Sequence, residues 1–485
     1  MSCVLIALPL YLCGRLKDAC YSIFTPHQLG TMPARQLRET VQRRSTVSRS
    51  KRRRLESLSR SDSPTDNIGQ GALTMTSLPV SITSRLAPEL YDHFLDEFRA
   101  SKSSLSACSS VCRSWLARCR HHLFSTANLR PDFVRFLRDS PHAFATITPY
   151  IRNIGLGGGW LREQQHEFND IILFMINLER VLEIHMETWS WTYLASPAAT
   201  ALLSGQGKIF QTLTVLDLKF IHFPSFSTLR TLGSQFPKLQ ELEFDNVTWD
   251  ETDDADAIQP TPPPTFLPGL EKLSVYACSN EPIISWLSNA VAEDGIAVVA
   301  PIRFLYLPEV LPHEATLVGN FLSTLPSSLE GLELGFLAHN SDDTPAIQDV
   351  VGGMDLSFHT KLRTIRLHQL SLYQFPSTPP TPTSSPPLAE ISPYVWLIPF
   401  LSRIGSSELS EIAFNIWLGG ERQLDLIDWR ALVKVLDNPR FTKLRLLQFN
   451  VRGIEEAMDE EVRGWISHRL RDWDAAKEFL KVSFE

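Results

Sequence analysis

Thiol and imidazole side chains gather in one short segment of the sequence, where they would be candidate zinc ligands: Cys108, Cys112, Cys119, His121 and His122. Zinc sites use such ligands, commonly with closely spaced pairs of cysteines. The C-x-x-C spacing is absent here, and the three cysteines fall on the apolar stripes of predicted helices. We therefore expect no metal and no other cofactor.

Two further segments have residue types that suit ligand chemistry. Gly155, Gly157, Gly158 and Gly159 follow a strand-like stretch, but they lack the G-x-G-x-x-G register of a phosphate-binding loop, so a turn is favoured. The acids between Asp250 and Asp256 lack the spaced glycine and final glutamate of a calcium loop. No Ser, His and Asp grouping stands out among 13 scattered histidines. The sequence predicts a non-catalytic protein.

The cysteine-rich segment belongs to a pattern of three short amphipathic helices. Pro88 stands at a helical first position and Glu89 in the first turn, as expected at a helix start. The apolar positions of the three stretches are Leu90, Phe94, Leu95 and Phe98, then Leu105, Cys108, Val111 and Cys112, then Trp115, Leu116, Cys119 and Leu123. Fewer than about forty residues rarely bury enough apolar surface to fold alone. The rest of the chain or another protein must therefore complete this core.

The same segment resembles an F-box in the form common among fungal proteins. The resemblance rests on Leu86, Pro88, Glu89 and Leu90, on Leu105 with Ala107, Cys108 and Ser109, and on Val111, Cys112, Arg113, Ser114 and Trp115; Ala87 stands where the family usually has proline. It implies a three-helix module, residues 81–125, that docks on the Skp adaptor of cullin-RING ubiquitin ligases. The adaptor contacts it implies are Leu86, Pro88, Leu90, Leu105, Val111, Cys112, Trp115 and Leu116. For Leu90, Leu105 and Cys108 a role in holding the helices together is favoured over adaptor contact, whereas contact is favoured for Leu86, Pro88 and Trp115.

The remaining chain repeats a strand-like unit, apolar-x-x-apolar-x-apolar. The unit occurs as Ile151/Ile154/Leu156, Val181/Ile184/Met186, Leu213/Leu216/Leu218, Leu239/Leu242/Phe244, Leu270/Leu273/Val275, Ile302/Leu305/Leu307, Leu329/Leu332/Leu334, Leu362/Ile365/Leu367, Leu409/Ile412/Phe414 and Leu444/Leu447/Phe449. Most units are separated by about 26 to 35 residues, which fits or slightly exceeds the leucine-rich repeat period. Helix-like stretches lie between strands at 226–236, 283–291, 315–325, 395–404 and 427–436.

Strands that alternate with helices at this period predict parallel strands side by side, with each helix on the outer face. The predicted fold class is therefore α/β: an F-box module, then a solenoid over residues 126–485 that resembles divergent leucine-rich repeats. The inner Asn or Cys typical of such repeats is mostly missing, with Asn246 and Cys278 near that position. A capping helix is expected within Ile454–Phe484. The rival interpretation is a doubly wound domain, which would bind a ligand beyond its strand ends.

Three segments stand apart from this core. Residues 1–80 hold 12 Lys/Arg and 5 Asp/Glu and predict a disordered basic leader, in which Arg43–Arg60 is a nuclear-import signal or a solvated tail. Met1–Cys13 is apolar, but no Lys or Arg precedes it as in a secretory signal. The insert at 250–268 is first acidic and then Pro-rich, and the insert at 376–393 is rich in Pro, Ser and Thr. Both compositions predict surface excursions from the solenoid.

Composition excludes several classes of function. The net charge is −8 for the chain and −15 without the leader, so general nucleic-acid binding is not expected. No apolar run approaches the 18 or so residues of a membrane helix, so no membrane is expected as a partner. Seven cysteines, an odd number, fit reduced thiols in the cytoplasm or nucleus.

The F-box resemblance, together with the predicted solenoid, implies a substrate-recognition subunit, with the F-box on the Skp adaptor, a cullin joined through that adaptor, and the solenoid on an unknown target protein. Tryptophans just after several strands are the candidate target contacts, although each also suits internal packing: Trp160, Trp189, Trp191, Trp249 and Trp417. The alternative is an interaction scaffold that binds the adaptor without acting in ubiquitylation.

Overall fold

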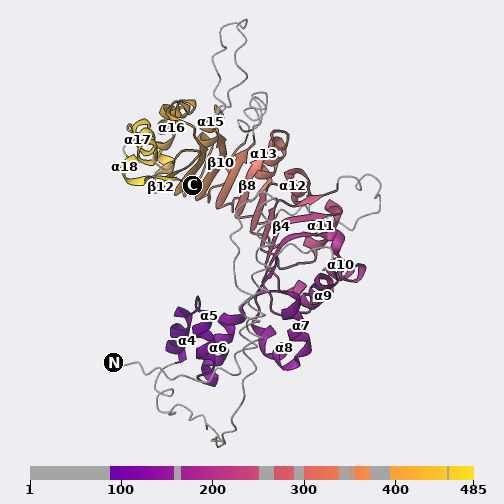
Figure 1. Cartoon of the computed structure of the whole chain (residues 1–485). Helices are drawn as coiled ribbons and strands as arrows, with labels where there is room; N and C mark the ends of the chain where they lie inside the picture. Colours follow the sequence, from indigo (N-terminus) through magenta and orange to yellow (C-terminus); the bar gives the residue numbers. More distant parts are fainter. Residues whose placement is uncertain are drawn as a thin grey trace, which may run out of the picture. The chain divides into compact units, whose positions relative to one another are not determined.

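A computed structural model of the chain describes residues 88–157, 165–250, 267–288, 300–337, 351, 354–371, 394–455, 458–473 and 475–484 (Figure 1). The leader, Leu86, Trp160, the insert at 376–393 and nearly all of the insert at 250–268 lie outside these residues. The chain divides into two compact units between Cys119 and Arg120, and each is considered by itself. None of the described helices is both long and apolar enough to cross a bilayer.

The first unit has three short helices, α4 (Pro88–Glu97), α5 (Lys102–Ser109) and α6 (Arg113–Phe124). The Ser101 side chain caps α5 by accepting a hydrogen bond from the Ser104 amide. One side chain from each helix is fully buried: Leu95, Leu105 and Cys119. The Arg118 guanidinium donates two hydrogen bonds, of 2.8 and 2.7 Å, to the Asp96 carboxylate and so ties α6 to α4. With three buried apolar residues among those described, these helices have a very small core.

The second unit is built on one 13-stranded sheet, in which every pair of neighbouring strands is parallel. The strands are β1 (Thr126–Asn128), β2 (Asn153–Leu156), β3 (Glu183–Ser190), β4 (Val215–Phe223), β5 (Glu241–Asp245), β6 (Thr248–Trp249), β7 (Lys272–Tyr276), β8 (Phe304–Val310), β9 (Gly331–Phe336), β10 (Thr364–Ser371), β11 (Glu411–Trp417), β12 (Leu446–Arg452) and β13 (Leu480–Phe484). They follow one another in chain order, apart from β6, which pairs with β4.

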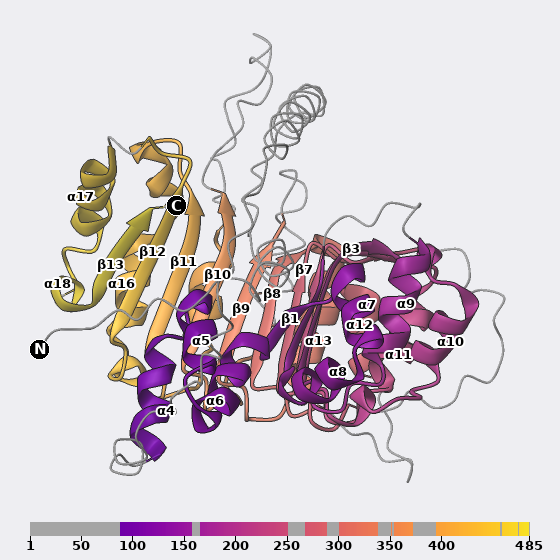
Figure 2. The same cartoon turned by 60° about the horizontal axis from the view of Figure 1, so that its bottom comes forward.

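This strand order explains why the helices share one face of the sheet. Crossovers between parallel strands are almost always right-handed, so crossovers that always advance in the same direction place their helices on the same side. Figures 1 and 2 show strands along the inner side of an arc within this unit and helices along its outer side. A doubly wound domain requires the order to reverse, so the rival interpretation is wrong. The predicted parallel strands with intervening helices are confirmed.

The helices of the second unit are α7 (Pro131–Asp139), α8 (Pro141–Ile147), α9 (Gln165–Met175), α10 (Ser196–Leu203), α11 (Phe226–Ser234), α12 (Asn280–Ser288), α13 (Ala315–Thr324), α15 (Leu397–Ser402), α16 (Trp429–Leu436), α17 (Asp459–Arg469) and α18 (Ala476–Phe479). Five of these, α11, α12, α13, α15 and α16, overlap the five helix-like stretches in the sequence, of which residues 289–291 lie outside the described residues. Strands β1, β6 and β13 were not predicted. The C-terminal region contains α17, as expected for a helix there, but ends in a strand that extends the sheet.

The core lies between the sheet and its helices. All three apolar positions of each of the ten repeat units are buried. The register aligns them across the sheet, so that Ile184, Leu216, Leu242 and Leu273 stand side by side in β3, β4, β5 and β7. Each fully buried Leu or Ile contributes about 1.5–3 kcal/mol, and each repeat completes its core with its neighbours. The residues between these positions therefore lie on the opposite, inner face.

Candidate protein-interaction surfaces

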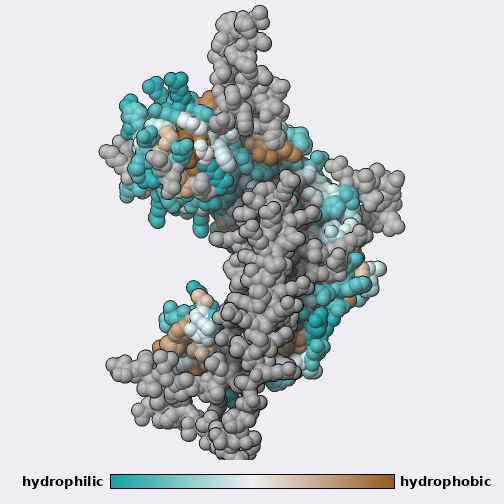
Figure 3. Space-filling view, viewed as in Figure 1, coloured by the Kyte–Doolittle hydropathy of each residue, from teal (hydrophilic) through white to brown (hydrophobic). Residues whose placement is uncertain are grey.

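The three-helix unit exposes apolar side chains that its small core does not use. Leu90 is 57 %, Phe94 48 % and Val111 41 % exposed. Figure 3 shows hydrophobic surface at this unit, in brown, beside α4. Isolated exposed apolar residues are common, but a group of them on a unit this small is typical of an interaction surface.

Trp115 lies beside this exposed group. Its ring centroid is 5.9 Å from those of Tyr91 and Phe94, and Phe94 also packs edge-on against Phe98 at 4.9 Å. Trp115 is partly buried, and its indole Nε1 is buried without a hydrogen-bond partner. Buried indole N–H groups usually have a partner. The aromatic cluster therefore supports the ring of Trp115 but leaves its polar atom unsatisfied.

The other predicted adaptor contacts fall in different environments. Leu105 is fully buried, so it supports the helices and offers no surface. Cys112 and Leu116 are partly buried, and the Cys112 Sγ is 3.0 Å from the Ser114 Oγ. Pro88 begins α4. Its side chain and the whole of Leu86 lie outside the part of the chain that the structure describes.

Two cysteines of this unit, Cys108 and Cys119, are poorly suited to thiolate chemistry. Burial raises the pKa of Cys119 to about 11 and also raises the pKa of Cys108. A thiol with a raised pKa is a weak nucleophile and a weak metal ligand at neutral pH. Within the described residues, no group of three or more His, Cys, Asp or Glu is placed to hold a metal ion.

The inner face of the sheet carries rows of mostly polar side chains, which the spacing of the apolar positions alone did not identify as neighbours. The position between the second and third apolar residues of each unit forms one row across the sheet: Gly155, His185, Asp217, Glu243, Ser274, Tyr306, Glu333, Arg366, Ala413 and Gln448. The sequence did contain a signal for this row: its members are the residues between the second and third apolar positions of each repeat unit. Once the strands are parallel and in register, such positions must be neighbours.

Charged side chains on the C-terminal half of this inner face are paired with one another. Arg366 lies 2.6 Å from Glu333 and 3.1 Å from Glu411. His368 Nε2 is 2.8 Å from a Glu333 oxygen, and its Nδ1 is 2.8 Å from the Asn415 Nδ2. Because the Asn415 amide donates to Nδ1, the proton is on Nε2 and is donated to Glu333. This network leaves little unpaired charge.

The N-terminal half has an excess of acids instead. The Lys219 Nζ lies 3.1 Å from Glu243 and 3.4 Å from Asp217. The His185 Nδ1 is 2.9 Å from the Asp217 Oδ2, and this hydrogen bond raises the pKa of His185 above 6.5. Glu183, Glu187 and Asp245 stand near these groups in the sheet register. Carboxylates therefore outnumber cations here.

The predicted target-contact tryptophans differ in exposure. Trp189 and Trp191 are buried and stack on each other with centroids 5.9 Å apart. Trp249 is partly buried and packs on Phe226 at 5.1 Å. Trp417 is 44 % exposed, at the end of β11. Burial leaves Trp189 and Trp191 little surface for a target, whereas Trp417 presents its ring.

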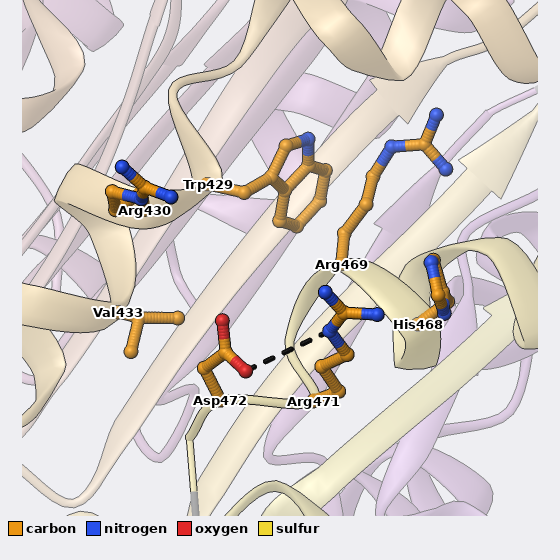
Figure 4. Close-up of a pocket in the computed structure, with 7 residues that line it drawn as sticks. All are labelled: Trp429, Arg430, Val433, His468, Arg469, Arg471 and Asp472. Carbon is orange, nitrogen blue, oxygen red and sulfur yellow. Dashed lines mark ion pairs between the residues drawn. The ribbon is translucent and has the colours of Figure 1, made fainter.

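A shallow hollow lies between α16 and the end of α17 (Figure 4). It is lined by Trp429, Arg430, Val433, His468, Arg469, Arg471 and Asp472. Two of its three arginines already have acidic partners: Arg469 pairs with Glu421 and Asp425, and Arg471 lies 3.6 Å from Asp472. Because most of its positive charge is used, the hollow is a weak candidate for anion binding.

In comparisons with known proteins, no family model and no curated sequence matches this chain.

Proposed function

We propose that this protein is a substrate-recognition subunit of a cullin-RING ubiquitin ligase. In this proposal, the three-helix unit docks on the Skp adaptor as an F-box, and the sheet unit, as a divergent leucine-rich-repeat solenoid, holds a target protein. The chain itself performs no bond chemistry. Holding the target near the transferring subunits raises its effective concentration there.

The observation that supports this most is the exposed apolar surface of the three-helix unit. Leu90, Phe94 and Val111 are 41–57 % exposed, beside a partly buried Trp115. Burying such side chains at an interface is favourable by about 25 cal/mol for each Å² of apolar surface removed from water. The F-box resemblance in the same residues identifies the Skp adaptor as the proposed occupant.

Co-expression of the full chain with a Skp adaptor tests this proposal through the double variant Leu90→Asp/Val111→Asp. Both side chains are exposed, so a charge there disturbs the interface more than the fold. We expect the wild type to retain the adaptor on an affinity column. The variant should retain at least tenfold less adaptor, because a carboxylate buried in an apolar interface lacks a partner. Trp115→Ala should also lose the adaptor.

The matched control is Phe358→Asp, since Phe358 is 68 % exposed in the sheet unit. It removes an apolar group elsewhere that is more exposed than Leu90 or Val111, and it should leave adaptor capture unchanged. Equal capture by the double variant and the wild type would contradict the proposal. Cullin recovered with the adaptor supports a ligase subunit, whereas adaptor without cullin supports the scaffold alternative.

A further inference from the structure

Acidic side chains cluster on the inner face of strands β3, β4 and β5. We call this set the acidic cluster: Glu183, Glu187, Asp217, Glu243 and Asp245. In the rows that hold these acids, the described basic residues of β3, β4 and β5 are His185 and Lys219, while His222, further along β4, pairs with Asp250. The register sets His185, Asp217 and Glu243 side by side in one row, and Glu187, Lys219 and Asp245 in the next.

The two basic groups are already engaged by part of the cluster. Lys219 contacts Glu243 and Asp217, and His185 contacts Asp217 and Glu183. Among the described residues, the Glu187 and Asp245 carboxylates have no hydrogen bond and no ion pair within 4 Å. Burial raises the pKa of Asp245. Lys219 lowers it, but the neighbouring carboxylates, Glu187 among them, raise it further. Mutual repulsion of this kind is relieved by an added cation.

Asp217 provides an independent observation. It is only 8 % exposed, and its Oδ2 is used by His185 and Lys219. Its other oxygen, Oδ1, is buried without a hydrogen-bond partner. Buried carboxylate oxygens nearly always accept a hydrogen bond. The unpaired oxygen, beside two unpaired carboxylates, points to a donor from outside the described residues.

We propose that the acidic cluster binds an arginine- and lysine-rich segment of the target protein. A guanidinium donates several hydrogen bonds in a plane, which suits carboxylates on neighbouring strands. Tyr276, in register with Asp245 and 45 % exposed, adds an aromatic ring at the border of the cluster, where arginine side chains stack favourably. On the C-terminal half of the inner face, by contrast, Glu333 and Glu411 are both paired with Arg366.

This inference rests on the proposed function for the identity of the occupant, but its test does not need the adaptor. Fluorescence anisotropy with the full-length protein would use a labelled decapeptide of alternating Arg and Ser, and a Glu/Ser decapeptide as the reference. The test variant is Glu187→Gln/Asp245→Asn, which removes unpaired charges and should not lower the melting temperature. We expect the wild type to prefer the Arg/Ser peptide, and the variant to bind it about tenfold more weakly at low salt.

The matched control is Asp132→Asn/Glu460→Gln, two acids whose side chains are 95 % and 85 % exposed outside the cluster. It should bind the Arg/Ser peptide within twofold of the wild type. Equal binding by the cluster variant, or no preference over the Glu/Ser peptide, would overturn the proposal.

A second arm distinguishes the source of the basic segment. In a variant with Lys51, Arg52, Arg53 and Arg54 changed to Ser, binding of the Arg/Ser peptide should stay the same. Binding that appears only in this variant would overturn the proposal, since the chain's own leader would then occupy the cluster. If the wild-type protein does not bind the Arg/Ser peptide but still captures the adaptor, the inference about the acidic cluster fails while the proposed function stands.

Discussion

At the scale of single residues, burial holds the His359 side chain in its neutral form. His359 is 1 % exposed, and its Nε2 is 3.1 Å from the Leu322 carbonyl oxygen on α13. Its Nδ1 is buried without a partner. Burial lowers the pKa of His359 below 6.5, because the imidazolium form would lose its hydration there. The folded chain therefore keeps this side chain neutral.

This lowered pKa predicts how stability depends on pH. Below pH 6.5 the unfolded chain binds a proton at His359 that the folded chain does not, so acidification favours unfolding; above pH 6.5 the effect is absent. We expect the melting temperature to fall between pH 7.5 and 5.5, and to fall less in His359→Gln. The exposed His313, changed to Gln, should leave the wild-type dependence intact. An identical pH dependence in His359→Gln would contradict this account.

At the scale of elements, a buried carboxylate joins two consecutive repeats. Glu314 is 1 % exposed in the short 3-10 helix Pro312–Glu314 that precedes α13. Its Oε1 accepts hydrogen bonds from the Asn280 and Glu281 amides at the start of α12, at 2.6 and 3.2 Å. Its Oε2 accepts from the Asn280 Nδ2 and the Leu311 amide, at 2.8 and 3.0 Å. Glu314 thus caps α12 from the following repeat.

Glu314→Gln should destabilise the sheet unit by about 2 kcal/mol. One of the two carboxylate oxygens would be replaced by an NH₂ donor, which cannot accept the hydrogen bonds that this oxygen now accepts. Thermal unfolding followed by circular dichroism measures this as a lower melting temperature. Glu281→Gln changes an exposed acid in the first turn of α12 and should have a much smaller effect. A Glu314→Gln protein as stable as the wild type would refute the capping role.

Periodic elements could be predicted from the sequence, whereas isolated ones could not. Leu216 and Leu218 belong to an apolar spacing that recurs in every repeat. Both the strand that holds them and the burial of their side chains can therefore be predicted from that spacing. Strand β1 has three residues and β13 follows a helix of four, which leaves no periodic signal. The acidic cluster was missed because unpaired charge depends on side-chain distances between strands about 30 residues apart. Glu314 shows the same limit, because its donors come from another repeat.

At the scale of the whole molecule, the chain combines a three-helix unit with little core of its own and a sheet unit with a continuous one. Repeats that bury their apolar positions against each other make the second unit self-sufficient. Over its described residues, the first unit has three fully buried apolar side chains and several exposed ones. This contrast is the physical basis for expecting an outside subunit on the helices, and a target protein on the sheet.

Hydrogen–deuterium exchange of the full-length protein, with and without a purified Skp adaptor, tests this central claim most directly. Amides in α4, α5 and α6 should exchange rapidly in the free chain, because units with small cores open readily. We predict that the adaptor slows their exchange at least tenfold and leaves strands β3–β12 unchanged. Unchanged exchange in all three helices at saturating adaptor, or helices already fully protected without it, would contradict the account.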